Sequence, residues 1–402
     1  MLMKKIYLSK PGIICASGSS LSEFWKNITE GNQASIKKAD GDFSGRTFYT
    51  AQVSVPLPKP VSVRYDSRAI RLIDFALNQI APDVEKAVSL YGAERTGVCV
   101  GTCDNGSELS YEAHKKFFTE NHFPENYNME MQSAHYNSSF IKEKFSLKGP
   151  ALAFTTACSS GAAAVIQGAR LIKAGVCDAV IAGGSDVASD TVLLGFDSLE
   201  AVSSSKTNPF SKNRDGITLG EGAAFFVLSK DPLDESRILL EGYGESSDAY
   251  HMTSPDPSGD GAYDAMKKAL ESAGLSAEDI GYLNLHGTGT HLNDSMEAAA
   301  VDRLFASYKV PCSSTKCMTG HTLGAAAAVE LAACYEAVVM NRSKEDALLP
   351  VQIWDGEKDE ELPQLNFVSR ESAVFKKHKV RHCMSSSFAF GGNNACLIIG
   401  EE

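Results

Sequence analysis

The most restrictive feature of this 402-residue sequence is that its second half repeats the pattern of its first half. In both halves a long helical pattern leads into a short apolar strand, and a turn of small residues later precedes an Ala-rich helix. The parallel segments are 67–101 and 262–285, 155–164 and 315–328, and 220–229 and 391–400. Three parallels in the same order indicate an internal duplication. We therefore predict a layered α/β fold of two similar halves, residues 1–235 and 236–402, joined near 231–237.

Local patterns predict the individual elements of this fold. Apolar residues at helical spacing predict helices at 21–30, 67–90, 108–118, 130–145 and 262–273. Ser67 is a suitable N-cap for the longest of these helices, and Pro82 lies inside it, where proline interrupts or kinks a helix. Short apolar runs predict a first strand near 4–8 and buried strands at 97–101, 151–154, 179–182 and 282–285.

Composition excludes several classes of function. With 43% apolar residues the chain can form a large core, and its formal net charge of −12 opposes non-specific binding to nucleic acid or to an anionic membrane. The ten cysteines form no pair or Cys/His group at metal-site spacing, so we expect reduced thiols, no metal and a cytoplasmic protein. Lys10 and Pro11 interrupt the first apolar run, which argues against a signal peptide. No segment approaches the ~20 apolar residues of a membrane span.

Cys158 is the first candidate for a catalytic residue. The stretch 151–164 has the pattern of a short strand, a turn of small residues with Cys158 in it, and an Ala-rich helix. Unpaired N–H groups and the dipole of a helix N-terminus stabilise a thiolate, so this position is expected to lower the pKa of the thiol and to suit a nucleophile. The alternative is a small buried apolar residue, which is what most free cysteines are.

Two histidines lie in similar turns of small residues. His286 is in the stretch 285–290 and His321 is in 320–324, and both stretches are rich in glycine and threonine. A lone histidine is more often structural, but two of them in a duplicated chain that also holds Cys158 favour a shared site. A thiolate and two imidazoles suit acyl transfer through a thioester, because the thiolate can hold the acyl group while the imidazoles stabilise an enolate. A Cys-His-acid protease is the alternative, although it needs only one histidine.

Several motifs together resemble those of a known family over nearly the whole chain. They lie at 23–25, 156–161, 214–216, 220–223, 248–255, 285–290, 320–324 and 387–392. In this order they resemble an elongating β-ketoacyl-acyl carrier protein synthase, a type II condensing enzyme of the thiolase superfamily. The resemblance implies the thiolase fold, in which two pseudo-symmetric βαβαβαββ halves form five layers, α-β-α-β-α.

The resemblance also implies the reaction and its main residues. An acyl group is held as a thioester on Cys158, while His286 and His321 promote the decarboxylation of malonyl-carrier protein and stabilise the enolate. The enolate then lengthens the acyl chain by two carbons in a decarboxylative Claisen condensation. Lys316 and Glu330 are implied to hold the hydrogen bonds and the charge balance of the site. No cofactor is expected.

Further site residues follow from the same resemblance. The backbone N–H groups of Cys158 and Phe390 are implied to form the oxyanion hole, and Phe390 is implied to gate the acyl pocket. Asp294 and Glu297 are interpreted as structural acids, although the family sometimes binds a cation near there. The residues implied to contact the substrate are Thr253, Thr288, Thr290, Phe196 and Phe388.

The partners are expected to be proteins. Carrier proteins are acidic, so the resemblance implies a basic docking patch at Arg64 and Arg68, with Lys212 or Arg214 as additions. From the residues alone, a solvated helix face is the competing interpretation of these charges. We also expect a homodimer, or a heterodimer with a related subunit, in fatty acid or in polyene or polyketide biosynthesis.

Two related classes of protein are the alternatives to an elongating synthase. A degradative thiolase uses a second cysteine as a base, but Cys383 and Cys396 lack its glycine context. A catalytically silent chain-length factor typically lacks the nucleophile.

The sequence also departs from the usual pattern of the family it resembles. Ala389 stands where glycine is usual and Asn393 where threonine is usual, which predicts a less mobile gating loop. The polar region 121–144 predicts a short acyl pocket or an unusual acyl chain.

Overall fold

The computed structural model describes residues 5–39, 46–60, 62–104, 106–125 and 127–402. Twelve strands form one hydrogen-bonded network, in the order β14-β12-β11-β16-β17-β10-β1-β9-β7-β5-β6, with β2 paired to β9. Their bounds are β1 Tyr7–Leu8, β2 Gly12–Cys15, β5 Thr96–Gly101, β6 Ala151–Phe154, β7 Ala179–Asp186, β9 Gly222–Ser229, β10 Ile238–Ser247, β11 Ile280–Asn284, β12 Pro311–Ser313, β14 Asn366–Phe367, β16 His382–Phe388 and β17 Asn393–Glu401.

The strand order repeats between the two halves of the chain. In the first half β6, β5 and β7 are parallel and β9 follows antiparallel to β7. In the second half β12, β11 and β16 are parallel and β17 follows antiparallel to β16. The short strand β1 pairs with both β9 and β10 and so joins the halves. The predicted duplicated α/β fold is confirmed, and the exact division between 235 and 236 stays a prediction.

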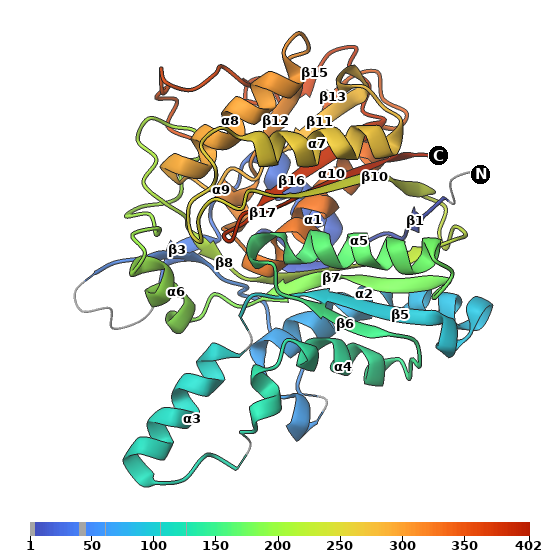
Figure 1. Ribbon diagram of the computed structural model, residues 1–402, viewed down its shortest axis with the longest axis vertical. Coiled ribbons are helices and arrows are strands. Elements are labelled where there is room, and N and C mark those ends of the chain that lie inside the picture. Colours follow the sequence, from blue (N-terminus) through green and yellow to red (C-terminus); the bar gives the residue numbers. More distant parts are fainter. Residues whose placement is uncertain (1–4, 40–45, 61, 105, 126) are drawn as a thin grey trace.

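The helices complete five layers (Figure 1). The outer helices α2 and α4 cover the strands of the first half, α5 and α10 lie between the two sets of strands, and α7 and α8 cover the second half. Three apolar clusters fill the spaces between these layers, because each helix buries its apolar side against a sheet face. The bounds are α2 Arg68–Tyr91, α4 His135–Lys144, α5 Ser160–Lys173, α7 Asp260–Ala273, α8 His291–Phe305 and α10 Ala326–Asn341.

The remaining elements are shorter. They are the helices α1 Leu21–Glu30, α3 Ser107–Glu120, α6 Asp190–Asp197 and α9 Lys316–Thr319, and the strands β3 Ile36–Lys38, β4 Tyr49–Ala51, β8 Leu219–Gly220, β13 Ala347–Leu348 and β15 Val374–Phe375. The helix predicted at 130–145 is divided into a 3₁₀ turn, Met129–Gln132, and α4. The helix α3 extends away from the main body of the protein (Figure 1).

Two sequence expectations about helices are corrected by the structure. Pro82 does not interrupt α2, because it lies on the exposed side of the helix while Leu77, Ile80 and Val84 pack into the core on the other side, and a kink at Pro82 stays a prediction. Among the described residues, one helical stretch, Leu323–Asn341, is long and apolar enough to span a membrane, contrary to the expectation that no segment approaches such a length. Most of that stretch is buried inside the protein, where it contributes the central helix α10.

Glycines let the starts of the two central helices come close together. A Cβ atom at Gly161, in the first turn of α5, would lie 2.9 Å from the carbonyl oxygen of Gly324. A Cβ atom at Gly184 of β7 would lie 2.5 Å from the same oxygen. Real Cβ atoms essentially never lie within 3.0 Å of such an atom, so only glycine, which has no Cβ, permits this close approach. The close approach places the turn before α5 beside the turn before α10, and these turns carry Cys158 and His321.

Candidate active site

Cys158 lies in a tight 3₁₀ turn, Ala157–Ser159, between β6 and α5. Ala157 has a φ of 49°, a left-handed conformation that non-glycine residues rarely adopt. Side chains hold the turn: the N–H of Thr156 donates to Ser160 Oγ at 2.9 Å, and Ser159 Oγ donates to the Thr156 carbonyl at 2.8 Å. The predicted position between strand and helix is therefore correct, and the turn holds the thiol in a fixed orientation.

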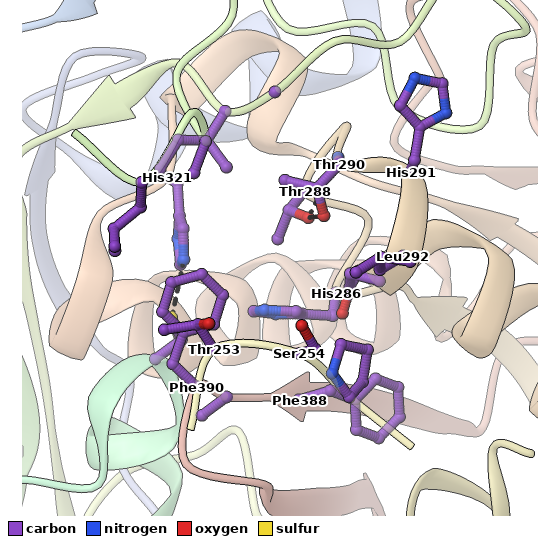
Figure 2. Close-up of a pocket in the computed structure, with 18 of the residues that line it drawn as sticks. Thr253, Ser254, His286, Thr288, Thr290, His291, Leu292, His321, Phe388 and Phe390 are labelled. Carbon is purple, nitrogen blue, oxygen red and sulfur yellow. Dashed lines mark hydrogen bonds between the residues drawn. The ribbon is translucent and has the colours of Figure 1, made fainter. Parts of the chain in front are cut away.

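His321 is the first partner of the thiol. Its Nε2 atom lies 3.0 Å from Cys158 Sγ, as the dashed line in Figure 2 shows. Its backbone is anchored to the first half of the chain, because its N–H donates to the Thr218 carbonyl and its carbonyl accepts from the N–H of Gly220. Burial and the positive charge of Lys316 lower the pKa of His321 well below its ordinary value. The imidazole is therefore neutral at pH 7 and can accept the thiol proton.

His286 lies on the other side of the same space, with its ring centroid 5.4 Å from that of His321 (Figure 2). Lys316 Nζ donates to the His286 carbonyl at 2.5 Å and lies 3.3 Å from His286 Nδ1. An ammonium group can only donate, so Nδ1 accepts and Nε2 carries the ring hydrogen. Burial and the charge of Lys316 also lower the pKa of His286 well below its ordinary value. His286 is thus a neutral donor.

Lys316 itself is fixed by a buried ion pair with Glu330 of α10. Both side chains are at most 2% exposed, and Lys316 uses its hydrogens on Glu330 and on His286. Burial raises the pKa of Glu330 to about 7, although Lys316 opposes that rise. The second carboxylate oxygen of Glu330 is buried and has no hydrogen-bond partner among the described residues. The pair therefore lies behind His286 and orients it without lining the cavity.

The expected low pKa of Cys158 was wrong. Burial raises the pKa of this thiol to about 11, because the sulfur is taken away from water and a thiolate there is poorly solvated. Lys316 and the backbone N–H groups of Phe390 and of Cys158 itself act in the opposite direction. These two N–H groups are the ones implied for the oxyanion hole, which stays a prediction. Without bound substrate the group at this position is a thiol beside a neutral imidazole.

Two acids of α8 hold the loop that carries His286 by accepting hydrogen bonds from its backbone. Glu297 accepts from the N–H groups of His286 and Gly287, both at 2.7 Å, and Asp294 accepts from the N–H groups of Thr288 and Gly289. Burial raises the pKa of Glu297 to about 7. These contacts support the structural role that was expected for both acids, because their oxygens are occupied by the loop backbone.

Asp186 was not singled out from the sequence. It is fully buried at the end of β7 and accepts from the N–H groups of Cys103, Asp104 and Gly324 and from Thr102 Oγ1. It thereby ties the loop after β5 to the turn that follows His321. An acid two residues after the apolar run 179–184 was a visible signal, since a buried carboxylate at a strand end needs several donors.

A cavity of about 300 Å³ opens above the three reactive side chains. Its lining brings together Cys158, His286 and His321 with Phe390, the residue expected to form the gate, and with every residue expected to contact substrate, namely Thr253, Thr288, Thr290, Phe196 and Phe388. Phe196 and Phe390 stack with their centroids 5.9 Å apart, and Phe388 lies edge-on to His286. The wall also contains polar residues that were not foreseen, Glu200, Asp215 and Asp248. The roles expected for the site residues in catalysis and in substrate binding stay predictions.

The loop 388–393 shows how Ala389 is accommodated, while the gating role and the reduced mobility of this loop stay predictions. Positive φ values occur at Gly391 and Gly392, whereas Ala389 has an ordinary φ and its N–H donates to the Asn393 carbonyl at 2.9 Å. Alanine is thus compatible with the observed loop conformation. The loop is tied to the mouth of the cavity, because the N–H of Gly391 donates to the Met252 carbonyl at 2.7 Å. None of the described residues of 121–144 lines the cavity.

The basic residues expected to dock a carrier protein lie outside the cavity lining. Arg64 donates to Glu130 and Glu143, and Arg68 is paired with the buried carboxylate of Glu221. Their side chains are 46% and 36% exposed, and their docking role stays a prediction. Arg214 is only 3% exposed and is paired with Asp359, so the suggestion that it contacts a docked protein was wrong.

The two cysteines considered as the second catalytic cysteine of a degradative thiolase lie outside the cavity lining. Cys383 lies in β16 and Cys396 in β17, and both described side chains are fully buried and absent from the cavity lining. The fold and the site together define an acyl-transfer protein of the thiolase fold with a Cys-His-His centre.

Comparison with known proteins identifies the family. Residues 11–232 match the family described as "Beta-ketoacyl synthase, N-terminal domain", and residues 238–343 match "Beta-ketoacyl synthase, C-terminal domain". A 3-oxoacyl-[acyl-carrier-protein] synthase 2 of Coxiella burnetii is 31% identical over 99% of each chain, and nodulation protein E of Rhizobium meliloti is 30% identical over 98% of each. The chain therefore belongs to the β-ketoacyl synthase family.

Solved structures agree with this assignment. A chain of the structure described as a ketosynthase (ApeO) in complex with its chain length factor (ApeC) from Xenorhabdus doucetiae superimposes with a TM-score of 0.91. It is 37% identical, and the match covers 99% of this chain and 98% of that one. The ishigamide ketosynthase/chain length factor gives a TM-score of 0.88 at 27% identity over the whole of both chains.

Proposed function

We propose that this protein is an elongating β-ketoacyl-acyl carrier protein synthase. The observation that carries the proposal is the meeting of Cys158, His286 and His321 in one cavity, with Lys316 holding His286 as a neutral donor. A chain-length factor that does no chemistry has no use for this arrangement. The membership of the β-ketoacyl synthase family supports the same reaction class.

The first half-reaction loads the enzyme. As Cys158 Sγ attacks the carbonyl carbon of an acyl thioester, the thiol proton passes to His321 Nε2, 3.0 Å away. The carbonyl oxygen gains negative charge and accepts from the N–H groups of Cys158 and Phe390. The carrier protein's sulfur then leaves and takes the proton from His321. Because the resting group is a thiol with a raised pKa, proton transfer has to accompany the attack.

The second half-reaction forms the carbon–carbon bond. When malonyl-carrier protein enters, its terminal carbon–carbon bond breaks, carbon dioxide leaves, and the electron pair forms an enolate. The Nε2–H of His286 donates to the enolate oxygen, and the rings of His286 and His321 both remain neutral because burial opposes their charging. The enolate carbon attacks the acyl carbonyl, the bond to Cys158 breaks, and the thiolate takes up one proton from the solvent.

The partners follow from this chemistry. Both substrates are carried on acidic carrier proteins, so we propose that an acyl carrier protein docks at the mouth of the cavity. A ketosynthase in the solved structures is paired with a chain length factor, which supports a dimer with a second copy or with a related chain. A soluble location in the cytoplasm agrees with these partners. Whether the pathway makes fatty acids or polyenes and polyketides is decided by the acyl chain that the cavity accepts.

The test separates loading from condensation. The enzyme is mixed with acyl-carrier proteins of graded length and unsaturation, the adduct on Cys158 is found by intact mass and peptide mapping, and the 3-oxoacyl product is measured after malonyl-carrier protein is added. Cys158→Ala is expected to abolish both steps. His286→Ala is expected to retain the adduct and to slow condensation about 10²–10³-fold, as loss of one donor to a developing oxyanion does.

Cys103→Ser is the matched control, because this partly buried thiol lies near Ser160 and does not line the cavity. Its adduct and product are expected to equal those of the wild type. An enzyme that forms no adduct on Cys158 with any donor would contradict the proposed function.

A further inference from the structure

The reactive side chains also form a set of ligands for a metal ion. The potential ligand atoms of Cys158, His286 and His321 all lie within 4.8 Å of one another, and Cys158 Sγ is 3.0 Å from His321 Nε2. Within the part of the chain that the structure describes, this is the one group of three such side chains with ligand atoms so close. All three face the cavity, which provides a route for entry and room for a fourth ligand.

The spacing is close to that of a tetrahedral zinc site. Zinc–sulfur bonds of about 2.3 Å and zinc–nitrogen bonds of about 2.0–2.1 Å place neighbouring ligand atoms about 3.3–3.6 Å apart. The observed contact of 3.0 Å and the upper limit of 4.8 Å lie on either side of these values. Side-chain movements of roughly 1 Å therefore suffice to close the three ligands around one ion. One sulfur and two imidazole nitrogens are also the donors that this ion prefers.

We propose that the unacylated enzyme binds Zn²⁺ through Cys158 Sγ and the imidazoles of His286 and His321, with water as the fourth ligand, and that the bound ion inhibits acyl loading. The ion is an inhibitor and not a cofactor, because it occupies the atoms that loading requires. The binding part of the inference stands on the geometry alone, and the inhibition part rests on the proposed function. An acyl group on Cys158 removes the sulfur ligand, so loading protects the enzyme.

The release of protons on binding keeps the net charge of the buried site constant when it takes up a dication. Coordination replaces the hydrogen of the Cys158 thiol and the hydrogen of His286 Nε2. Lys316, 3.3 Å from His286 Nδ1, supplies a hydrogen to that nitrogen as the Nε2 hydrogen leaves. Two protons reach the solvent for each Zn²⁺ bound, and the net charge of the buried site is unchanged.

The outer contacts indicate reversible binding. Zinc-bound histidines normally donate their second ring hydrogen to an oxygen acceptor, which raises metal affinity. His321 Nδ1 is buried and has no hydrogen-bond partner among the described residues. The affinity is therefore expected to be lower than that of a structural zinc site, and a chelator is expected to restore activity.

Cobalt provides a readout that is independent of catalysis. Co²⁺ is titrated into the full-length enzyme, and a thiolate-to-cobalt charge-transfer band is expected to saturate at one ion per chain and to vanish when Zn²⁺ is added. Cys158→Ser is expected to abolish the band, and His286→Ala to weaken Co²⁺ binding about tenfold or more. Cys103→Ser is the matched control and is expected to keep the band. Wild-type enzyme that has been acylated beforehand is expected to show no band, which tests the same sulfur without a mutation.

The outcomes distinguish this inference from the proposed function. A saturable band with Zn²⁺ inhibition that acylation prevents supports the inference. An enzyme that condenses substrates but gives no thiolate band, or one whose band survives in Cys158→Ser, overturns it. If the band from Cys158 is observed but the protein never forms a 3-oxoacyl product, the metal site is supported and the proposed function is refuted.

Discussion

Removing the charge of Lys316 tests how the buried ion pair maintains the site. Lys316 and Glu330 are at most 2% exposed, so solvent does not screen their interaction. Breaking a buried pair by removing one partner typically costs about 3–5 kcal/mol, because the other charge is left uncompensated. We therefore expect Lys316→Met to lower the free energy of unfolding by about that amount at pH 8, measured by urea denaturation. Lys148→Met is the matched control, since its pair with Glu94 is well exposed and is worth at most about 1 kcal/mol.

The dependence of this cost on pH gives a second check. Burial raises the pKa of Glu330 from 4.5 to about 7 even with Lys316 present, so the folded protein binds a proton that the unfolded chain has released. For a carboxyl with a raised folded pKa, stability falls as pH rises from 4.5 to about 7 and then levels off. At pH 5.5 Glu330 is protonated and the loss of Lys316 is expected to cost less than half of its value at pH 8.

The double variant Lys316→Met/Glu330→Leu completes the experiment. Both charges are gone and the volume is nearly preserved, so most of the lost stability is expected to return. Condensation is expected to stay impaired, because nothing then fixes the ring hydrogen of His286 on Nε2, whereas loading of Cys158 continues. A loss below about 1 kcal/mol for Lys316→Met at pH 8, or full condensation activity in the double variant, would refute the role given to this pair.

Three further substitutions test the packing, the cavity and the docking surface. Gly324→Ala places a Cβ 2.6 Å from Asp186 Oδ2 and is expected to cost about 1–3 kcal/mol in thermal or urea unfolding, while Gly195→Ala, which meets nothing within 4 Å, is expected to be neutral or slightly stabilising. Phe196→Ala removes the ring stacked on Phe390 and is expected to shift the preferred acyl donor toward longer or bulkier chains in competition assays; an unchanged preference would show that Phe196 does not shape the acyl pocket. Arg64→Glu is expected to raise KM for the carrier protein about tenfold with kcat unchanged, and an unchanged KM would eliminate Arg64 from docking.

Several features could be predicted because they depend on local sequence. The repeated segments predicted two similar halves, since each unit buries its apolar faces in the same way. The positions of Cys158, His286 and His321 were visible because turns of small residues beside apolar strands are local patterns. The cavity lining then contains these three residues, although their catalytic roles stay predictions.

Other features depend on which distant residues meet, and these only the tertiary structure decided. Helix position alone predicted a low pKa for Cys158, but packing of the second half against it buries the sulfur and raises the pKa to about 11. The contact of Asp186 with the turn after His321 joins residues 138 positions apart, and no local pattern encodes it. Arg64 was expected to be part of a basic docking patch, whereas folding brings the acids Glu130 and Glu143 to it. The sequence by itself thus determined the reactive groups and their turns, while burial and long-range pairing determined their protonation and their partners, because both depend on segments far apart in the chain.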